Sequence, residues 1–117
     1  MRKLLFIQSH APHGTLFGQE GLDAILAGSA FADCAVLFLG DGVYQLLKDQ
    51  ATQTLASRNY SVSYQALFDY GVDAIFCSAA DLLTRGLTLE DLIVAPTPLN
   101  PKELEAILHD YDVILDF

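Results

Sequence analysis

The chain has 117 residues, of which 15 are acidic and 6 basic, giving a formal net charge of −9, and 52% of its residues are hydrophobic. Its length suits one domain with its own core, and we predict a single domain over residues 1–117. The basic residues are scattered apart from Arg2 and Lys3, which excludes the clustered cations that direct binding to nucleic acid needs.

The cysteine content and the N-terminus indicate a cytoplasmic protein. Cys34 and Cys77 lack the spacing of a zinc site or of a disulfide framework, so we expect reduced thiols and neither metal nor cofactor. The first apolar run ends at Gln8, too early for a signal peptide, and no later stretch reaches transmembrane length. The hydrophobic fraction is high for a small chain, so we expect apolar surface to be covered in an oligomer.

Short apolar runs recur along the chain and are separated by segments long enough for helices. Near-continuous apolar strands with helical crossovers are typical of a parallel sheet that is covered on both faces, so the fold class is α/β. A further run, Leu92–Val94, is a candidate fifth strand, restricted by the prolines that follow it. The four main runs are Leu4–Ile7, Cys34–Leu39, Val72–Phe76 and Val113–Phe117.

Five helices are predicted between these runs, one of them directly after Cys77 at residues 78–83. Residues 17–28 place small and apolar side chains on one helical face, with Leu22 and Leu26 forming a second apolar face. Residues 42–47 predict a short helix, and residues 59–70 a helix that Gly71 ends. Near the C-terminus the capping sequence from Asn100 to Glu103, with proline at the first helical position, predicts a helix start. Its inward stripe is Leu104, Ile107, Leu108 and Tyr111.

Cys77 is the candidate nucleophile. It closes the third run one residue before a predicted helix, with Ser78 as N-cap and Asp81 as its reciprocal capping partner. Helix N-terminal amides favour a thiolate, which is the reactive form of cysteine. A cysteine that ends a strand is more often a small buried hydrophobe, so both interpretations stay open. Cys34 lies inside an apolar run, and we assign it to the core.

The ends of the first three strands are predicted to meet at one edge of the sheet. In open parallel sheets, ligands collect at the carboxyl ends of the strands. This rim gathers His10 and His13 after the first run, Asp41 after the second and Cys77 after the third. Ordinary turn roles also account for the histidines and the aspartate. The glycines after the first run lack the spacing of phosphate-binding loops, which disfavours nucleotide binding.

Six short segments, taken in order, resemble the DsrE/DsrF-like proteins and, within them, the TusC-like (DsrF) subunits. The resemblance implies a three-layer α/β/α sandwich on a mostly parallel sheet of about five strands, in agreement with the strand pattern. The matching segments are APHG (11–14), EGLDA (20–24), DGVYQLL (41–47), RGL (85–87), TPL (97–99) and YDVILDF (111–117).

The resemblance also implies a function. TusC-like proteins belong to a dimer of heterotrimers with TusB-like and TusD-like subunits, which relays persulfide sulfur from a TusA-like donor to a TusE-like acceptor for 2-thiolation of the wobble uridine of tRNA. The main sulfur-carrying cysteine is credited to the TusD-like subunit, and Cys77 is the candidate persulfide at the similar place in this chain. A chain that passes sulfur only to proteins needs no basic face, consistent with the charge of −9.

Two other hypotheses stay open. The chain is alternatively a stand-alone, homo-oligomeric sulfur carrier that uses Cys77 with His10 or His13. A binding module that holds a small molecule at the same rim is the third possibility. The sequence also leaves open whether the downstream pathway is tRNA thiolation or sulfur oxidation.

Overall fold

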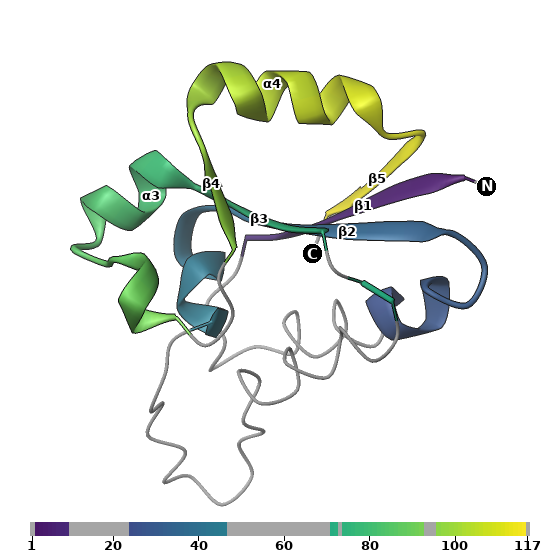
Figure 1. Cartoon of the computed structure of the whole chain (residues 1–117), viewed down its shortest axis with the longest axis horizontal. Helices are drawn as coiled ribbons and strands as arrows, with labels where there is room; N and C mark the ends of the chain where they lie inside the picture. The colour runs from purple at the N-terminus through teal and green to yellow at the C-terminus, as the bar shows by residue number, and fades with distance from the viewer. Residues whose placement is uncertain (1, 10–23, 47–70, 73, 93–95, 117) are drawn as a thin grey trace, which may run out of the picture.

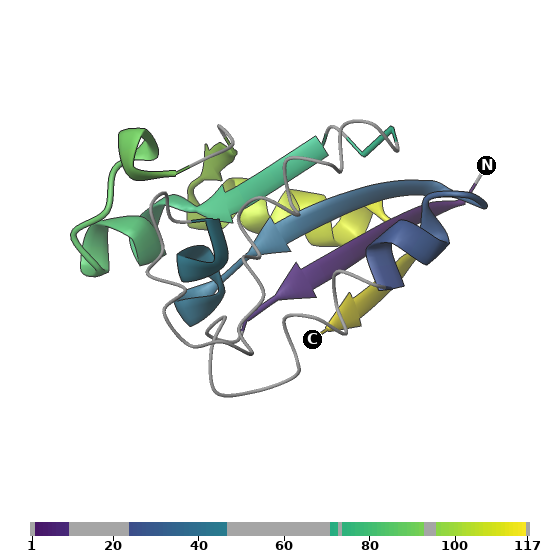
Figure 2. The same cartoon turned by 90° about the horizontal axis from the view of Figure 1, so that it is seen from below.

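The computed structural model describes residues 2–9, 24–46, 71–72, 74–92 and 96–116. Within these ranges, five strands form one sheet in the order β4-β3-β2-β1-β5, and every neighbouring pair is parallel. Figure 2 shows the arrowheads pointing the same way. The α/β class and the five-stranded parallel sheet are confirmed. The strands are β1 (Lys3–Gln8), β2 (Asp33–Phe38), β3 (Ala74–Ser78), β4 (Thr97–Leu99) and β5 (Val113–Asp116).

The sheet has a buried cluster on each face, because successive side chains of a strand point to opposite sides. Figure 1 shows α4 (Pro101–Asp110) on one side of the sheet and the helical segment 24–28 on the other, which makes three layers. The larger cluster contains Phe6, Ile25, Val36, Phe38, Val43, Leu46, Val72, Ile75, Cys77, Leu82 and Leu92. The smaller cluster contains Leu5, Ile7, Ala35 and Leu37, against which α4 packs Leu104 and Ile107.

The additional strand that we predicted at Leu92–Val94 is found later in the chain, as β4 at Thr97–Leu99. Leu92 is the C-cap of the 3-10 helix η3 (Leu89–Asp91), and residues 93–95 lie outside the described part. Pro98 stands inside β4, opposite Cys77 of β3. Proline is tolerated there because β4 is at the edge of the sheet, where a missing N–H removes no bond to a second neighbouring strand.

Helix α4 begins as the sequence predicts. The Asn100 side chain accepts a hydrogen bond from the Glu103 N–H at 2.8 Å, and the Glu103 carboxylate accepts one from the Asn100 N–H at 3.0 Å. Tyr111, the C-cap, packs against the sheet cluster together with two α4 residues. Leu108 of the predicted stripe is instead 38% exposed. It follows Ile107 by one residue, which turns its side chain about 100° around the helix axis, away from the sheet.

The remaining helical predictions fall partly on described residues. The predicted short helix over 42–47 is the 3-10 helix η1 (Gly40–Leu46), and Ile25 of the segment 24–28 is fully buried. The rest of the predicted helix over 17–28, and the helix over 59–70, lie outside the described residues. Within the described ranges, no helix has the length and apolar character needed to cross a membrane.

Candidate functional site

The carboxyl ends of β1, β2 and β3 lie at one edge of the sheet and form the candidate site. The Leu39 N–H donates to the Gln8 carbonyl at 3.0 Å, so the chain leaving β2 stays close to the end of β1. The next residue, Gly40, begins η1, and a side chain at Gly42 would overlap the Gln8 carbonyl oxygen. Glycine is therefore required at position 42, and this close approach sets Asp41 at the rim as predicted.

Cys77 lies inside β3, next to the start of helix α3 (Ala79–Thr84). The Ser78 side chain accepts a hydrogen bond from the Asp81 N–H at 3.2 Å, which confirms the predicted N-cap. The Cys77 side chain is 0% exposed and belongs to the same buried cluster as Val43 of η1 and Leu82 of α3. The thiol therefore faces the interior of the protein.

The electrostatic surroundings of Cys77 favour the neutral thiol. Burial, and to a smaller extent charge repulsion from the nearby Asp81 carboxylate, together raise its pKa to about 11. We expected the helix amides to favour the thiolate, but burial outweighs them. At pH 7 a thiol with this pKa is ionised in roughly one molecule in ten thousand.

Asp81 connects α3 to η1. Its Oδ2 accepts a hydrogen bond from the Gly40 N–H at 2.7 Å. Its Oδ1 lies 3.6 Å from Nη1 of Arg85, the C-cap of α3. We predicted instead that this carboxylate would return a bond to the Ser78 amide in a capping box. The chain leaving β2 supplies the Gly40 amide, a donor that a local capping pattern does not include.

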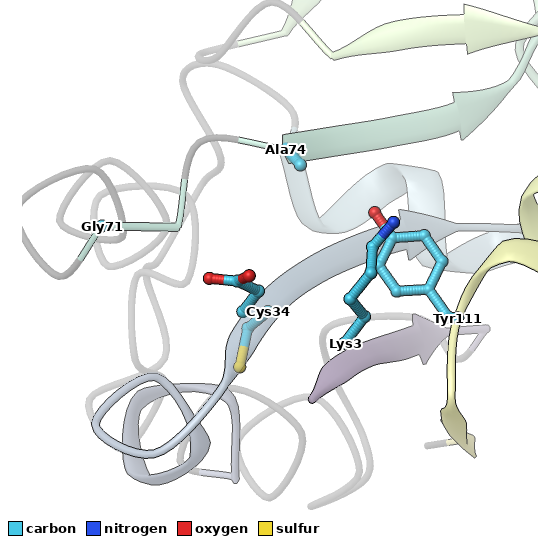
Figure 3. A pocket seen from close by; sticks show the side chains of 6 residues that line it. Lys3, Cys34, Gly71, Ala74 and Tyr111 are labelled. Carbon is cyan, nitrogen blue, oxygen red and sulfur yellow. The ribbon is translucent and has the colours of Figure 1, made fainter. Parts of the chain in front are cut away.

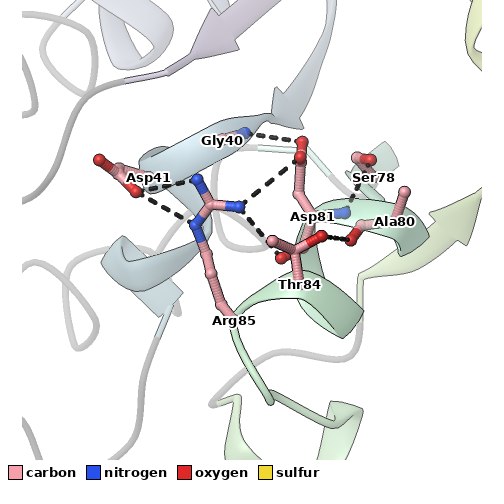
Figure 4. Close-up of polar contacts among 7 residues, drawn as sticks. All are labelled: Gly40, Asp41, Ser78, Ala80, Asp81, Thr84 and Arg85. Atoms are coloured by element: carbon pink, nitrogen blue, oxygen red, sulfur yellow. Dashed lines mark hydrogen bonds and ion pairs between the residues drawn. The ribbon is translucent and has the colours of Figure 1, made fainter.

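Arg85 is a functional candidate that the sequence pattern did not reveal. Its Nε and Nη2 donate to Asp41 Oδ1 at 3.1 and 2.9 Å, and its Nη1 donates to the Asp81 carbonyl at 3.2 Å. Figure 4 shows the guanidinium lying between Asp41 and Asp81. The guanidinium carbon is also 5.9 Å from the centre of the Tyr44 ring. The one available signal was an arginine at the end of a predicted helix in a chain with 6 basic residues.

The structure thus brings together part of the predicted rim. Asp41 and Cys77 lie at the same edge of the sheet, where Asp81 and Arg85 join η1 to α3. His10 and His13 lie outside the described residues. Ser9 follows β1, and its hydroxyl donates to Asp116 Oδ1 at 3.3 Å.

A pocket of about 140 Å³ lies at the opposite, amino-terminal edge of the sheet, where Cys34 is one of its lining residues. Figure 3 shows the Lys3 side chain beside the Tyr111 ring, whose centre is 4.9 Å from Lys3 Nζ. Lys3 Nζ also pairs with Asp110 at 2.9 Å. Cys34 is only partly buried, although it packs against the larger cluster, and burial raises its pKa. We assigned it to the core, but the start of β2 leaves one side of it open to this pocket.

Comparisons with known proteins agree with this architecture. The model of the family described as DsrE/DsrF-like matches residues 2–117. The crystal structure of the YchN protein from E. coli matches with a TM-score of 0.85 and 20% sequence identity, over 100% of both chains. At this identity the similarity shows the fold alone, and it confirms the α/β sandwich that the resemblance implied.

Proposed function

Because the chain belongs to the DsrE/DsrF-like family, we propose that it is a subunit of a sulfur relay, and specifically a TusC-like subunit of a TusBCD complex. Its neighbours are then TusB-like and TusD-like subunits, with a TusA-like donor and a TusE-like acceptor on the route to 2-thiolation of the tRNA wobble uridine. The family match over residues 2–117 carries the sulfur-relay part of this proposal, and the resemblance of the six short segments supports its TusC-like part.

The surroundings of Cys77 support a non-catalytic role for this subunit. A thiol that accepts sulfur must be accessible and must attack as a thiolate. Cys77 is 0% exposed, and its pKa is raised to about 11. We therefore place the main sulfur-carrying cysteine on a partner subunit, and keep Cys77 as the candidate persulfide of this chain for direct test.

Exposed apolar side chains support assembly with other subunits. Phe31 and Leu83 are 82% and 81% exposed, far more than the core residues on either side of the sheet. Phe31 lies just before the start of β2 and Leu83 lies in α3 after the end of β3, so each is a separate candidate contact with another subunit rather than part of one patch. Leu89, Leu108, Ile114 and Leu115 are also exposed, each by about 40%.

The test is gentle purification of the tagged chain from its native cells, followed by native mass spectrometry with identification of each subunit. Two copies each of three related small subunits are expected. A homo-oligomer or a monomer without these partners would reject the TusC-like assignment. Leu83→Gln, which changes an exposed side chain, serves as an interface variant, with Lys102→Gln on exposed α4 as its control.

A stand-alone sulfur carrier is the second candidate, favoured by the position of Cys77 at a strand end beside a helix start. It predicts that the purified chain alone gains the mass of one sulfur atom from inorganic polysulfide. Cys77→Ser would abolish this gain, whereas Cys34→Ser would retain it. A lack of sulfur uptake by the wild-type chain would remove this candidate.

A further inference from the structure

Arg85 and Asp81 join η1 to α3 at the carboxyl end of β3, close to the position of Cys77. We propose that these two residues form a clamp that holds η1 closed over Cys77, and that Arg85 is a positioning residue for this thiol. Opening the clamp is the step that admits a small thiol-reactive molecule. The relevance of this access to sulfur transfer rests on the proposed function, whereas the clamp itself does not.

The sheet register places η1 beside Cys77. Phe38 of β2 pairs with Cys77 of β3, and η1 begins two residues after Phe38, at Gly40. Val43 and Leu46 of η1 are fully buried in the cluster that contains Cys77. Moving η1 outward therefore removes apolar cover from the cluster in which the thiol is buried.

Two charged contacts hold η1 in place. The first is the 2.7 Å hydrogen bond from the Gly40 N–H to Asp81, made at the first residue of η1. The second is the pairing of Arg85 with Asp41, through two N–H groups at 2.9 and 3.1 Å. Hydrogen bonds to charged groups are among the stronger polar contacts in proteins. Both bonds run between η1 and the α3 region, and so resist the separation of these elements.

Arg85 has a further effect because its positive charge lies between two carboxylates. Asp41 comes from η1 and Asp81 from α3, and both lie against the same guanidinium. Without Arg85, two like charges would face each other across the junction and favour its opening. The Asp41 side chain is 59% exposed, whereas that of Arg85 is 20% exposed. Salt in the solvent can therefore reach the Asp41 side of this ion pair.

The proposal is tested by the rate at which iodoacetamide labels Cys77, read by mass spectrometry in a Cys34→Ser background. Arg85→Gln and Asp81→Ala are expected to speed labelling by roughly tenfold or more. Asp110→Asn is the matched control, because it breaks the exposed Lys3–Asp110 pair at the other end of the sheet without touching the clamp. It is expected to leave the rate unchanged.

A variant that merely unfolds more often would also label faster, so each rate is compared with the limit set by that variant's own global unfolding free energy, measured in urea. Labelling faster than this limit supports local opening of the clamp. Labelling at this limit in both clamp variants, or equal acceleration by Asp110→Asn, would overturn the proposal. Arg85→Lys is expected to restore part of the protection, because it keeps the charge.

The pH dependence of the labelling rate gives the apparent pKa of Cys77, which loss of packing alone would not shift in the direction expected here. Of the charged groups described at this end of the sheet, Asp81 raises the pKa of Cys77, and Arg85 lies between Asp81 and Asp41. Asp81→Asn keeps an oxygen that can accept from Gly40 but removes the charge, so it is expected to lower the apparent pKa of Cys77. An unchanged profile would contradict this arrangement. The assay contains neither partner subunits nor a sulfur donor, so its result is independent of the native-complex experiment.

Discussion

The Asp81 carboxylate accepts a hydrogen bond from the Gly40 backbone N–H at 2.7 Å, although 41 residues separate the two in sequence. Gly40 begins η1 with a φ of 52°, a left-handed conformation that glycine adopts at low cost. Asp81 sits in the first turn of α3, where a negative charge is favourable. This one contact therefore joins the exits of β2 and β3.

Asp81→Ala is expected to lower the free energy of unfolding by about 1.5–3 kcal/mol, because it removes a charged acceptor from the Gly40 amide. Urea denaturation at pH 7 measures this loss. Asp110→Ala removes an exposed ion pair and is expected to cost less than about 1 kcal/mol. Equal losses in the two variants would show that the Asp81 contact adds nothing beyond an exposed ion pair.

Gly42→Ala is expected to destabilise the fold by about 3 kcal/mol or more, because the added carbon overlaps the backbone of Gln8. Gly71→Ala is the comparison. Gly71 has a φ of 81° but open space where a side chain would go, so only backbone strain of about 1–2 kcal/mol is expected. Thermal unfolding of the two variants ranks the costs, and a larger loss in Gly71→Ala would refute the close approach of η1 to β1.

The Cys77 thiol predicts a loss of stability at alkaline pH. Its pKa is raised from the ordinary value of 9.0 to about 11, so the unfolded chain releases the proton at lower pH than the folded protein does. The stability that the folded protein gains by holding this thiol neutral is complete below about pH 9. It is lost as the pH rises toward about 11. The destabilisation caused by Cys77→Ala is therefore expected to be about 1 kcal/mol smaller at pH 10 than at pH 7.5.

Urea denaturation of the wild type and Cys77→Ala at both pH values measures this difference, since the titration of other groups cancels between the two proteins. Cys34→Ala is the control, with a smaller change expected because its side chain is partly exposed. A Cys77→Ala cost that is independent of pH would show that the thiol is less desolvated than its burial indicates.

Asn100→Ala removes one half of the capping box at the start of α4 and is expected to cost about 1 kcal/mol of stability. Asn100→Asp keeps a side-chain oxygen for the Glu103 N–H and is expected to retain most of it. Circular dichroism during thermal unfolding compares the three proteins. If both variants unfolded alike, the side-chain oxygen at this position would have no capping role.

Local patterns predicted the features that depend on neighbouring residues. The apolar runs located β1, β2 and β5 to within about two residues, and the capping sequence located the start of α4, because strand burial and helix capping are encoded within a few residues. The N-cap role of Ser78 was predictable for the same reason.

The candidate site depends on contacts between distant segments, which explains what the sequence did not reveal. Asp81 suited a capping box, but its partner is an amide 41 residues earlier. The prolines were expected to restrict a strand at Leu92–Val94, but the strand that forms at Thr97–Leu99 contains Pro98, which its position at the edge of the sheet allows. The charge state of Cys77 depends on burial by η1 and α3, which no local pattern at the end of β3 contains.

The sheet order has a consequence for the way the chain is made. β1 lies between β2 and β5, so it receives its second neighbour only after Val113–Asp116 has left the ribosome. The backbone amide of Lys3 then donates to Asp112 across 109 residues. Pairings over such separations close late and slowly. During synthesis, the edge of β1 that pairs with β5 therefore stays without this partner strand until the chain is almost complete to residue 116.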